Sequence, residues 1–348
     1  ESSPAAVNGK VYTGGDDGYV YCLDAYTGAL QWKTFVNGNL PFTFGNLVLK
    51  SSPAVVEGMA GTVVYIGSLD NYLYAIDADN GNIKWKTQAL GPIESSPAFF
   101  NGAVYFTAEE PDTGALYKLD ASTGAVMWKN EIPYRPSFTG GNQMLGSPSV
   151  TGNRVFASSN WGDYFCYNTE TGETLWRFQN PTATEFIVSS PIYIKYDPSG
   201  NAMVLLIDKF DLACIDISNG WVIWSKYTGD ELYVSPSVAG GKAYMATSQR
   251  HIFVLDITRN GTIIANVTLP SSTWSSPTIA NNRLYIGCND WYVYCFAETI
   301  TSVPSPTTTA PTNNSEAPSM TTVAIAVTAL VILPIVLGFV LRRQIKKF

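Results

Sequence analysis

A Ser-Pro pair that returns at near-regular intervals constrains this chain more than any other feature. Within one copy, residues 51–86, four runs rich in β-branched and aromatic residues alternate with turn residues, which predicts four antiparallel strands joined by hairpins. A period of about 40–50 residues with four strands per copy is typical of β-propeller blades. The seven prolines of the pair, spaced 41 to 51 residues apart, are Pro4, Pro53, Pro97, Pro148, Pro191, Pro236 and Pro277.

A tighter motif overlaps the third and fourth predicted strands of each copy. It consists of Asp or Asn, Gly at offset 4 and Trp at offset 8. The sixth copy departs from it, because Gly261 comes one residue late after Asp256 and no Trp follows; the seventh has Ala297 in the Asp position. The five copies that keep all offsets are Asp24, Gly28 and Trp32; Asp77, Gly81 and Trp85; Asp120, Gly124 and Trp128; Asn168, Gly172 and Trp176; and Asp216, Gly220 and Trp224.

We interpret this motif as structural. The carboxylate or amide accepts hydrogen bonds from its own turn, and the glycine adopts the positive φ that a bulged hairpin turn needs. The tryptophan buries a flat face between neighbouring blades while its N–H finds a partner. The motif therefore predicts how the blades are built and says little about activity.

At these residues the chain resembles the tryptophan-motif blades of the pyrroloquinoline-quinone-like (PQQ-like) propellers, over residues 1–298. The resemblance implies an all-β fold, a seven-bladed propeller of four-stranded antiparallel blades, or eight blades if one is missing upstream. That superfamily includes quinoprotein alcohol dehydrogenases and the non-enzymatic propeller of the bacterial outer-membrane protein assembly machine. The resemblance is specific for the fold and much less so for the activity.

The connections between strands are the predicted binding surface. We expect the turns between second and third strands to share a face with the links between copies, and both are rich in aromatic and acidic residues. An envelope protein or a polysaccharide would suit such a face; the alternative interpretation is that these are turn residues covering seams between blades. The candidate ligand-binding residues are Phe42, Phe44, Tyr134, Arg135, Trp161, Asp163, Trp274 and Trp291.

Residues suited to catalysis are few. The single histidine, His251, excludes His-based triads and multi-His metal sites within one chain, and we interpret it as a solvated turn residue. The quinone-dependent enzymes carry an adjacent Cys-Cys disulfide ring and a calcium site of Glu, Asn and Asp, whereas no two of the five cysteines here are adjacent. We therefore predict no catalytic residue, no metal and no cofactor. PQQ and Ca²⁺ belong only to the alternative, a quinone-dependent dehydrogenase of sugars or alcohols.

The C-terminal part has a different composition. Residues 299–321 are rich in Thr, Ser and Pro and predict an extended stalk. Residues 322–341 hold no charged side chain and are long enough to cross a bilayer as a helix, and the basic residues of 342–348 place the tail in the cytoplasm and the propeller outside. Sequons predict N-glycosylation at Asn260, Asn266 and Asn313.

These features together predict a single-pass, membrane-anchored cell-surface protein whose propeller binds or scaffolds a partner. No signal peptide precedes the first copy, so we expect a mature or truncated form. The net charge is −7, and without the four positive charges of the tail the remainder carries −11, so no nucleic-acid partner is expected. A purely architectural role in a surface layer is the third alternative.

Overall fold

A computed structural model describes residues 2–36, 49–59, 61–111, 113–131, 146–159, 162–179, 190–194, 203–208, 210–232, 234–280, 282–297 and 330–332. Over these residues the regular structure is β-strand throughout, except for a short 3₁₀ helix at Ile257–Arg259. The strands form seven separate four-stranded antiparallel sheets, and each of the first six takes its strands in chain order from one stretch of sequence.

The first three sheets cover the N-terminal part of the chain. They are β1 (Ala5–Val7), β2 (Lys10–Gly14), β3 (Tyr19–Asp24) and β4 (Leu30–Phe35); β5 (Ala54–Gly58), β6 (Gly61–Gly67), β7 (Tyr72–Asp77) and β8 (Ile83–Gln88); and β9 (Ala98–Phe100), β10 (Ala103–Glu110), β11 (Thr113–Asp120) and β12 (Val126–Glu131).

Four further sheets complete the set. They are β13 (Ser149–Thr151), β14 (Arg154–Ser158), β15 (Asp163–Asn168) and β16 (Thr174–Gln179); β17 (Ile192–Ile194), β18 (Met203–Asp208), β19 (Asp211–Asp216) and β20 (Val222–Tyr227); β21 (Ser237–Ala239), β22 (Lys242–Ala246), β23 (His251–Asp256) and β24 (Thr262–Thr268); and β25 (Thr278–Ala280), β26 (Arg283–Gly287), β27 (Val293–Ala297) and β28 (Leu330–Ile332).

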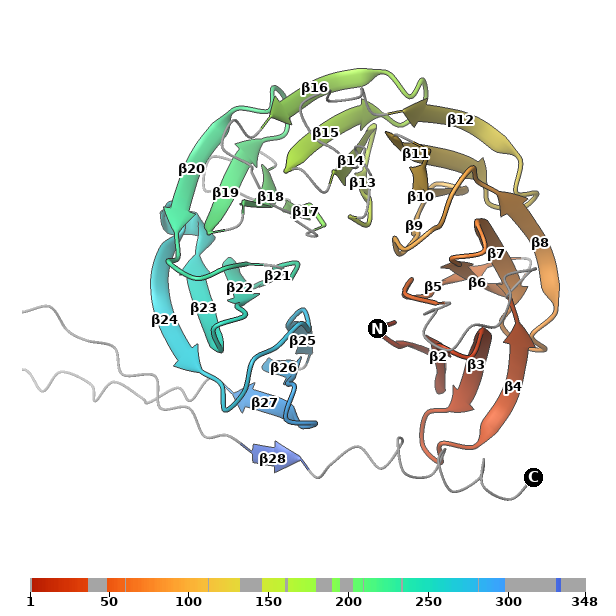
Figure 1. Ribbon diagram of the computed structural model, residues 1–348, viewed down its shortest axis with the longest axis horizontal. Helices are drawn as coiled ribbons and strands as arrows, with labels where there is room; N and C mark the ends of the chain where they lie inside the picture. Colours follow the sequence, from red (N-terminus) through yellow and green to blue (C-terminus); the bar gives the residue numbers. More distant parts are fainter. Residues whose placement is uncertain are drawn as a thin grey trace, which may run out of the picture.

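The sheets follow one another around a ring, with the first strand of each sheet innermost and the fourth outermost (Figure 1). The first strands of neighbouring sheets lie side by side, as β1 does with β5 and β5 with β9. The predicted all-β propeller of four-stranded antiparallel blades is therefore confirmed.

The last blade differs from the others in its outer strand. Strand β28 comes from far downstream and pairs with β27, Val293 opposite Ile332 and Cys295 opposite Leu330. Pairing satisfies backbone groups that the free edge of β27 would leave open.

Strand β28 also bears on the predicted membrane helix. Its three residues lie inside the segment 322–341, and there the structure shows a strand instead of a helix. The rest of that segment, the predicted stalk and the basic tail lie outside the described residues. Within the described ranges, no helix has the length and apolar character needed to cross a membrane.

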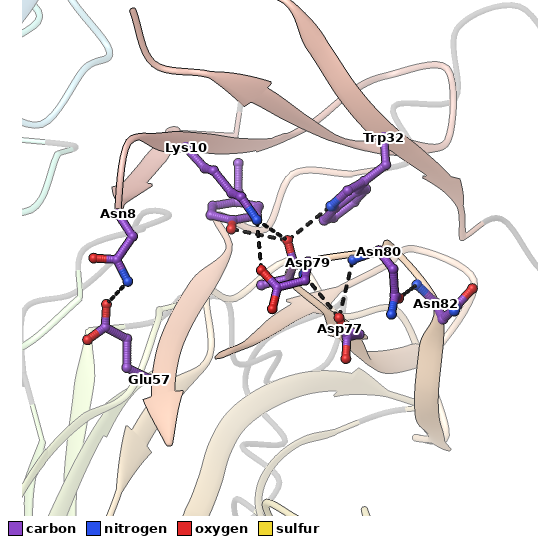
Figure 2. Close-up of polar contacts among 10 residues, drawn as sticks. Asn8, Lys10, Trp32, Glu57, Asp77, Asp79, Asn80 and Asn82 are labelled. Atoms are coloured by element: carbon purple, nitrogen blue, oxygen red, sulfur yellow. Dashed lines mark hydrogen bonds and ion pairs between the residues drawn. The ribbon is translucent and has the colours of Figure 1, made fainter. Parts of the chain in front are cut away.

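The seams between blades repeat one contact. The indole Nε1 of the motif tryptophan donates a hydrogen bond to the backbone oxygen of the residue that follows the Asp or Asn of the next blade. These bonds join Trp32 to Ala78 (3.0 Å), Trp85 to Ala121 (3.1 Å), Trp128 to Thr169 (3.0 Å) and Trp176 to Ile217 (2.8 Å). Figure 2 shows the first of these seams, where the Lys10 ammonium also reaches Asp79 of the second blade, 2.8 Å away.

The glycine of the following copy forms the other side of five seams. It adopts a positive φ, and it lies so close to the indole of the preceding blade that a Cβ would overlap the ring. At Gly124, where φ is +73°, a Cβ would come within 2.6 Å of Trp85. The same close approach is seen at Gly81, Gly172, Gly220 and Gly261. Glycine is thus required both by the turn and by the packing of the tryptophan.

The motif carboxylate orders the turn that carries this glycine. The Asp77 Oδ1 atom accepts hydrogen bonds from the backbone N–H groups of Asp79 and Asn80, at 3.0 and 3.2 Å (Figure 2). In the first blade, hydrogen bonds from the Thr27 hydroxyl and from the backbone of Thr27 and Tyr26 lower the pKa of the Asp24 carboxyl. The ionised side chain is therefore the form that the turn stabilises.

The serine of each Ser-Pro pair joins neighbouring blades near the axis. In five successive pairs, the backbone N–H of one serine donates to the hydroxyl of the equivalent serine in the next blade. The bonds run from Ser3 to Ser52, Ser52 to Ser96, Ser96 to Ser147, Ser147 to Ser190 and Ser190 to Ser235, at 2.9 to 3.0 Å. We call this set the serine ring. The Ser-Pro period predicts the repeat but not this contact between copies.

Replacing Gly124 by alanine, compared with the same change at Gly28, tests the packing role of the glycine. Both residues have φ near +70°, but nothing lies within 4 Å of a Cβ at Gly28. Gly28→Ala should lower the free energy of unfolding by about 1 kcal/mol, the backbone cost alone. Gly124→Ala should cost about 2–4 kcal/mol, because overlap with Trp85 is added. Urea unfolding midpoints measure both, and equal losses would show that the seam does not depend on this contact.

Candidate functional site

The turns between second and third strands lie on the same face as the links between blades. In the second and third blades, the link residue Ile93 donates its N–H to Ser68 O (3.1 Å), and Glu109 donates to Pro92 O (2.9 Å). In the last two blades, Leu269 donates to Arg250 O (2.6 Å) and Asn289 to Ser272 O (2.9 Å). We call this surface the loop face; it comprises residues 68–71, 89–95, 247–250, 269–276 and 288–292.

The eight candidate ligand-binding residues are not all placed by the structure. Phe42, Phe44, Tyr134, Arg135 and Trp161 lie outside the described residues. Asp163, Trp274 and Trp291 are described, and they differ sharply in exposure.

Asp163 is fully buried. Its exposed fraction is 0%, and its Oδ2 atom accepts a hydrogen bond from Arg177 Nη2 at 2.6 Å. The residue begins strand β15 and faces its own blade, where the guanidinium neutralises a charge that burial would otherwise make costly. The structure therefore does not present Asp163 to a ligand, contrary to the prediction.

Trp274 and Trp291 are exposed on adjacent loops of the loop face, with 64% and 88% of their surface accessible. Hydrogen bonds tie the two loops together: Asn289 Nδ2 donates to Ser272 Oγ (2.9 Å), and Thr273 Oγ1 donates to Gly287 O (2.6 Å). The structure thus brings these two candidates onto one anchored patch of the seventh blade.

The backbone of Trp291 is unusual for a bulky residue. Its φ is +73°, the left-handed conformation that this turn position requires. Gly18, Asn71 and Gly162 occupy the equivalent position in other blades, whereas Arg250 and Trp291 occupy it in the last two. Large side chains at such a position cost stability, and such strain is concentrated at functional sites. Sequence reasoning alone did not identify Arg250.

Several acidic turn residues on this face are bound within their own blades. Asp70 Oδ2 accepts from Tyr74 OH, and Asp290 Oδ2 accepts from Tyr294 OH, both at 2.6 Å. The pKa of Tyr294 is raised to about 12. The hydrogen bond to Asp290 is the largest cause, and burial and the charge of that carboxylate add to it. These carboxylates orient the turns of their own blades. Part of the acidic character that the sequence predicts for this face is therefore used in contacts within the blades.

Charges of both signs lie beside the loop face, next to the serine ring. Lys50 and Glu94 each stand two residues before a serine of the serine ring, and their Nζ and Oε1 atoms lie 2.5 Å apart. Burial and, after it, the charge of Glu94 raise the pKa of the Glu109 carboxyl. The charge of Lys50 lowers this pKa but does not cancel the rise. Trp274 stands at the position equivalent to Lys50 in the seventh blade.

His251 is not a simple solvated turn residue. Its Nδ1 atom lies 2.5 Å from Asp230 Oδ2, and the imidazole is half-buried. Thr247 donates its hydroxyl proton to the same carboxylate oxygen at 3.1 Å. Activation as a nucleophile would need this proton to be given to the imidazole, so His251 does not activate Thr247. The pair joins two loops 21 residues apart, and no local sequence pattern indicates such a contact.

Two features that the resemblance associates with a quinone and calcium centre, a disulfide of adjacent cysteines and a cluster of metal-ligating side chains, are not seen among the described residues. None of the five cysteines forms a disulfide, and burial raises the pKa of Cys166 to about 12 and that of Cys288 to about 11, which keeps both thiols neutral. Nowhere in the described ranges do three His, Cys, Asp or Glu side chains gather in an arrangement that could hold a metal ion.

Two predicted glycosylation sites can be placed. Asn260 and Asn266 are exposed, the first after the 3₁₀ helix and the second on outer strand β24. Asn313 lies outside the described residues. Glycosylation itself stays a prediction.

Comparison with known proteins defines the class. The family model described as outer membrane protein assembly factor BamB matches residues 1–90 and 92–299, so the chain belongs to this family. This agrees with the predicted PQQ-like propeller family.

Relatives include both assembly factors and enzymes. BamB of Yersinia pestis is 24% identical over 306 residues, covering 84% of this chain and 70% of that protein. Tetrathionate hydrolase of Acidithiobacillus ferrooxidans is 23% identical over 265 residues, covering 68% of this chain but only 50% of that protein. The crystal structure of quinohemoprotein alcohol dehydrogenase from Comamonas testosteroni is similar with a TM-score of 0.69 at 16% identity, covering 85% of this chain and 65% of that chain. At that identity the likeness concerns the fold alone.

Proposed function

We propose that this propeller is a binding scaffold of the cell envelope, which holds another envelope protein through its loop face. Membership of a family described as an outer membrane protein assembly factor supports this role. The observation that carries it is the anchored, exposed pair Trp274 and Trp291.

Exposed tryptophans on fixed loops have the character of binding hot spots. Tryptophan and arginine are enriched among residues that dominate interface energies, and rigid aromatic side chains lose little conformational entropy on binding. Here the two indoles lie on loops that are hydrogen-bonded to each other, and Arg250 Nη1 reaches the same link at Pro270 O (3.4 Å). An aromatic or acidic segment of a partner protein would complement this patch. A polysaccharide, stacking its sugar rings on the indoles, is the alternative ligand.

A double variant, Trp274→Ala with Trp291→Ala, tests the patch. Trp221→Ala is the matched control, because Trp221 is 75% exposed but lies in the turn between third and fourth strands, at the opposite ends of the strands. With the tagged full chain as bait in solubilised envelopes, the double variant should recover partner proteins at least about tenfold less well, and the control should match the unmodified chain. Equal recovery by all three chains would contradict the proposal. Loss of glycan binding with unchanged protein recovery would favour the polysaccharide.

We also propose that residues 322–341 attach the propeller to the membrane. Twenty residues without a charged side chain, followed by four basic residues, support this topology. Leu330–Ile332 cannot pair with β27 and lie in the bilayer at the same time, so attachment requires this strand to leave the seventh blade.

Alkaline extraction of membranes tests attachment. The full chain, exported behind a secretory signal, should stay in the membrane pellet after carbonate treatment. A variant whose residues 322–341 are replaced by a Gly-Ser linker of equal length should move to the supernatant. Release of the full chain would contradict the proposal and favour the strand arrangement.

A further inference from the structure

The motif turn of the first blade, residues 24–28, has the shape of the other motif turns but is exposed. Gly28 has a φ of +70° and donates its N–H to Asp24 O at 2.9 Å, and Gly81 donates to Asp77 O at the same distance. Gly28 is exposed, whereas its equivalents in the next five blades are buried against the indole of the preceding blade; they are Gly81, Gly124, Gly172, Gly220 and Gly261. The first turn is therefore formed without an indole on it, and we call it the acceptor turn.

At three seams, two backbone oxygens of the motif turn accept side-chain donors from the preceding blade. In the second blade, Ala78 O accepts the indole Nε1–H of Trp32 at 3.0 Å. Gly81 O accepts the hydroxyl of Thr34, two residues further along the same outer strand, at 2.5 Å. The next two seams repeat this pair of bonds, from Trp85 and Thr87 to Ala121 and Gly124, and from Trp128 and Asn130 to Thr169 and Gly172.

The corresponding oxygens of the acceptor turn belong to Ala25 and Gly28. Among the described residues, no side chain or backbone group donates a hydrogen bond to either oxygen. Ala25 is exposed, whereas its equivalents Ala78 and Ala121 are only 0% and 9% exposed. Because backbone oxygens are strong acceptors, the acceptor turn offers one complete half of the contact that joins blades elsewhere in the ring.

The blade that precedes the first one around the ring has no tryptophan on its outer strand. All five motif tryptophans pack on the glycine of the blade that follows them, as Trp224 does on Gly261. The seventh blade comes before the first around the ring (Figure 1), and its outer strand is Leu330–Ile332. Residues 292–348 contain no tryptophan at all. The seventh blade therefore brings no motif tryptophan to the acceptor turn.

We propose that the acceptor turn docks an edge β-strand of a partner protein that carries tryptophan and, two residues later, threonine or asparagine. Side chains two residues apart point to the same face of a strand, so both can meet one turn. The indole packs on Gly28 and donates to Ala25 O, and the second side chain donates to Gly28 O. This arrangement continues the seam contact that the ring already uses.

The acceptor turn is separate from the patch of Trp274 and Trp291. It joins a third strand to a fourth strand, at the opposite ends of the strands from the loop face. The docking of a strand here therefore does not rest on the proposed function.

A synthetic peptide with the sequence of residues 82–90 tests the site, because its Trp85 and Thr87 make this pair of bonds to the third blade. With 5-fluorotryptophan in the peptide, fluorine NMR follows its titration with the full chain, and we expect saturable binding. Gly28→Ala should weaken binding about tenfold, because its Cβ would occupy the place of the ring. At the five covered turns, a Cβ would lie only 2.4 to 3.0 Å from the indole.

Gly102→Ala is the matched control. Gly102 has a φ of +76°, nothing lies within 4 Å of a Cβ there, and it belongs to the turn between the first and second strands of the third blade. This variant should bind the peptide as tightly as the unmodified chain does. Cooperative thermal unfolding of both glycine variants would show that each is folded, so that a loss of affinity reports the site itself.

Unlabelled peptides compete for the site on the unmodified chain. Thr87→Val in the peptide removes one hydrogen bond and should weaken competition about fivefold. Trp85→Phe removes the N–H and part of the ring and should weaken it at least about tenfold. No saturable binding, equal affinity of the Gly28→Ala chain, or equal competition by the Trp85→Phe peptide would overturn the proposal. Dimers of the unmodified chain that Gly28→Ala abolishes would place a second copy on the turn and overturn the choice of a separate partner.

Discussion

The structure depends on an indole that bridges two blades. Each motif tryptophan belongs to the outer strand of one sheet, and its ring packs against the turn of the next sheet. In the first four blades that turn also accepts the hydrogen bond of the indole N–H. This explains why three residue types recur together: the carboxylate shapes the turn, the glycine lets the ring approach, and the backbone oxygen after the carboxylate accepts the N–H. Because each contact involves two successive copies, the motif specifies the ring as well as the blade. The serine ring repeats this logic near the axis.

A scaffold held in this way can tolerate loop features that lower its stability. Arg250 and Trp291 occupy a left-handed turn position that glycine or asparagine takes in other blades, and Trp274 and Trp291 leave large apolar surfaces exposed. These features gather in the sixth and seventh blades, where the motif itself is lost. A cavity beside Ala265 lies at the seam that lacks its tryptophan. The end of the repeat is therefore where the chain departs most from purely structural rules, and the proposed patch of Trp274 and Trp291 lies there.

Local patterns in the sequence were enough to predict the blades, because hairpin turns and the Asp, Gly and Trp offsets depend on neighbouring residues. They also indicated the loop face. Contacts between residues on different strands and loops were beyond such reasoning: the burial of Asp163 against Arg177 of the next strand, the pairing of His251 with Asp230, and the recruitment of Leu330–Ile332 to β27 follow no local pattern. Four candidate residues on the long links, among them Phe42 and Tyr134, and Trp161 in a turn lie outside the described residues and remain predictions.

Hydrogen exchange of the tryptophan side chains tests the central claim most directly. In ¹⁵N-tryptophan-labelled protein, the Nε1–H groups of Trp32, Trp85, Trp128 and Trp176 should exchange at least about a hundredfold more slowly than those of Trp274 and Trp291, because opening a seam must precede exchange. Fast exchange at all of these groups would mean that the indoles do not hold neighbouring blades together.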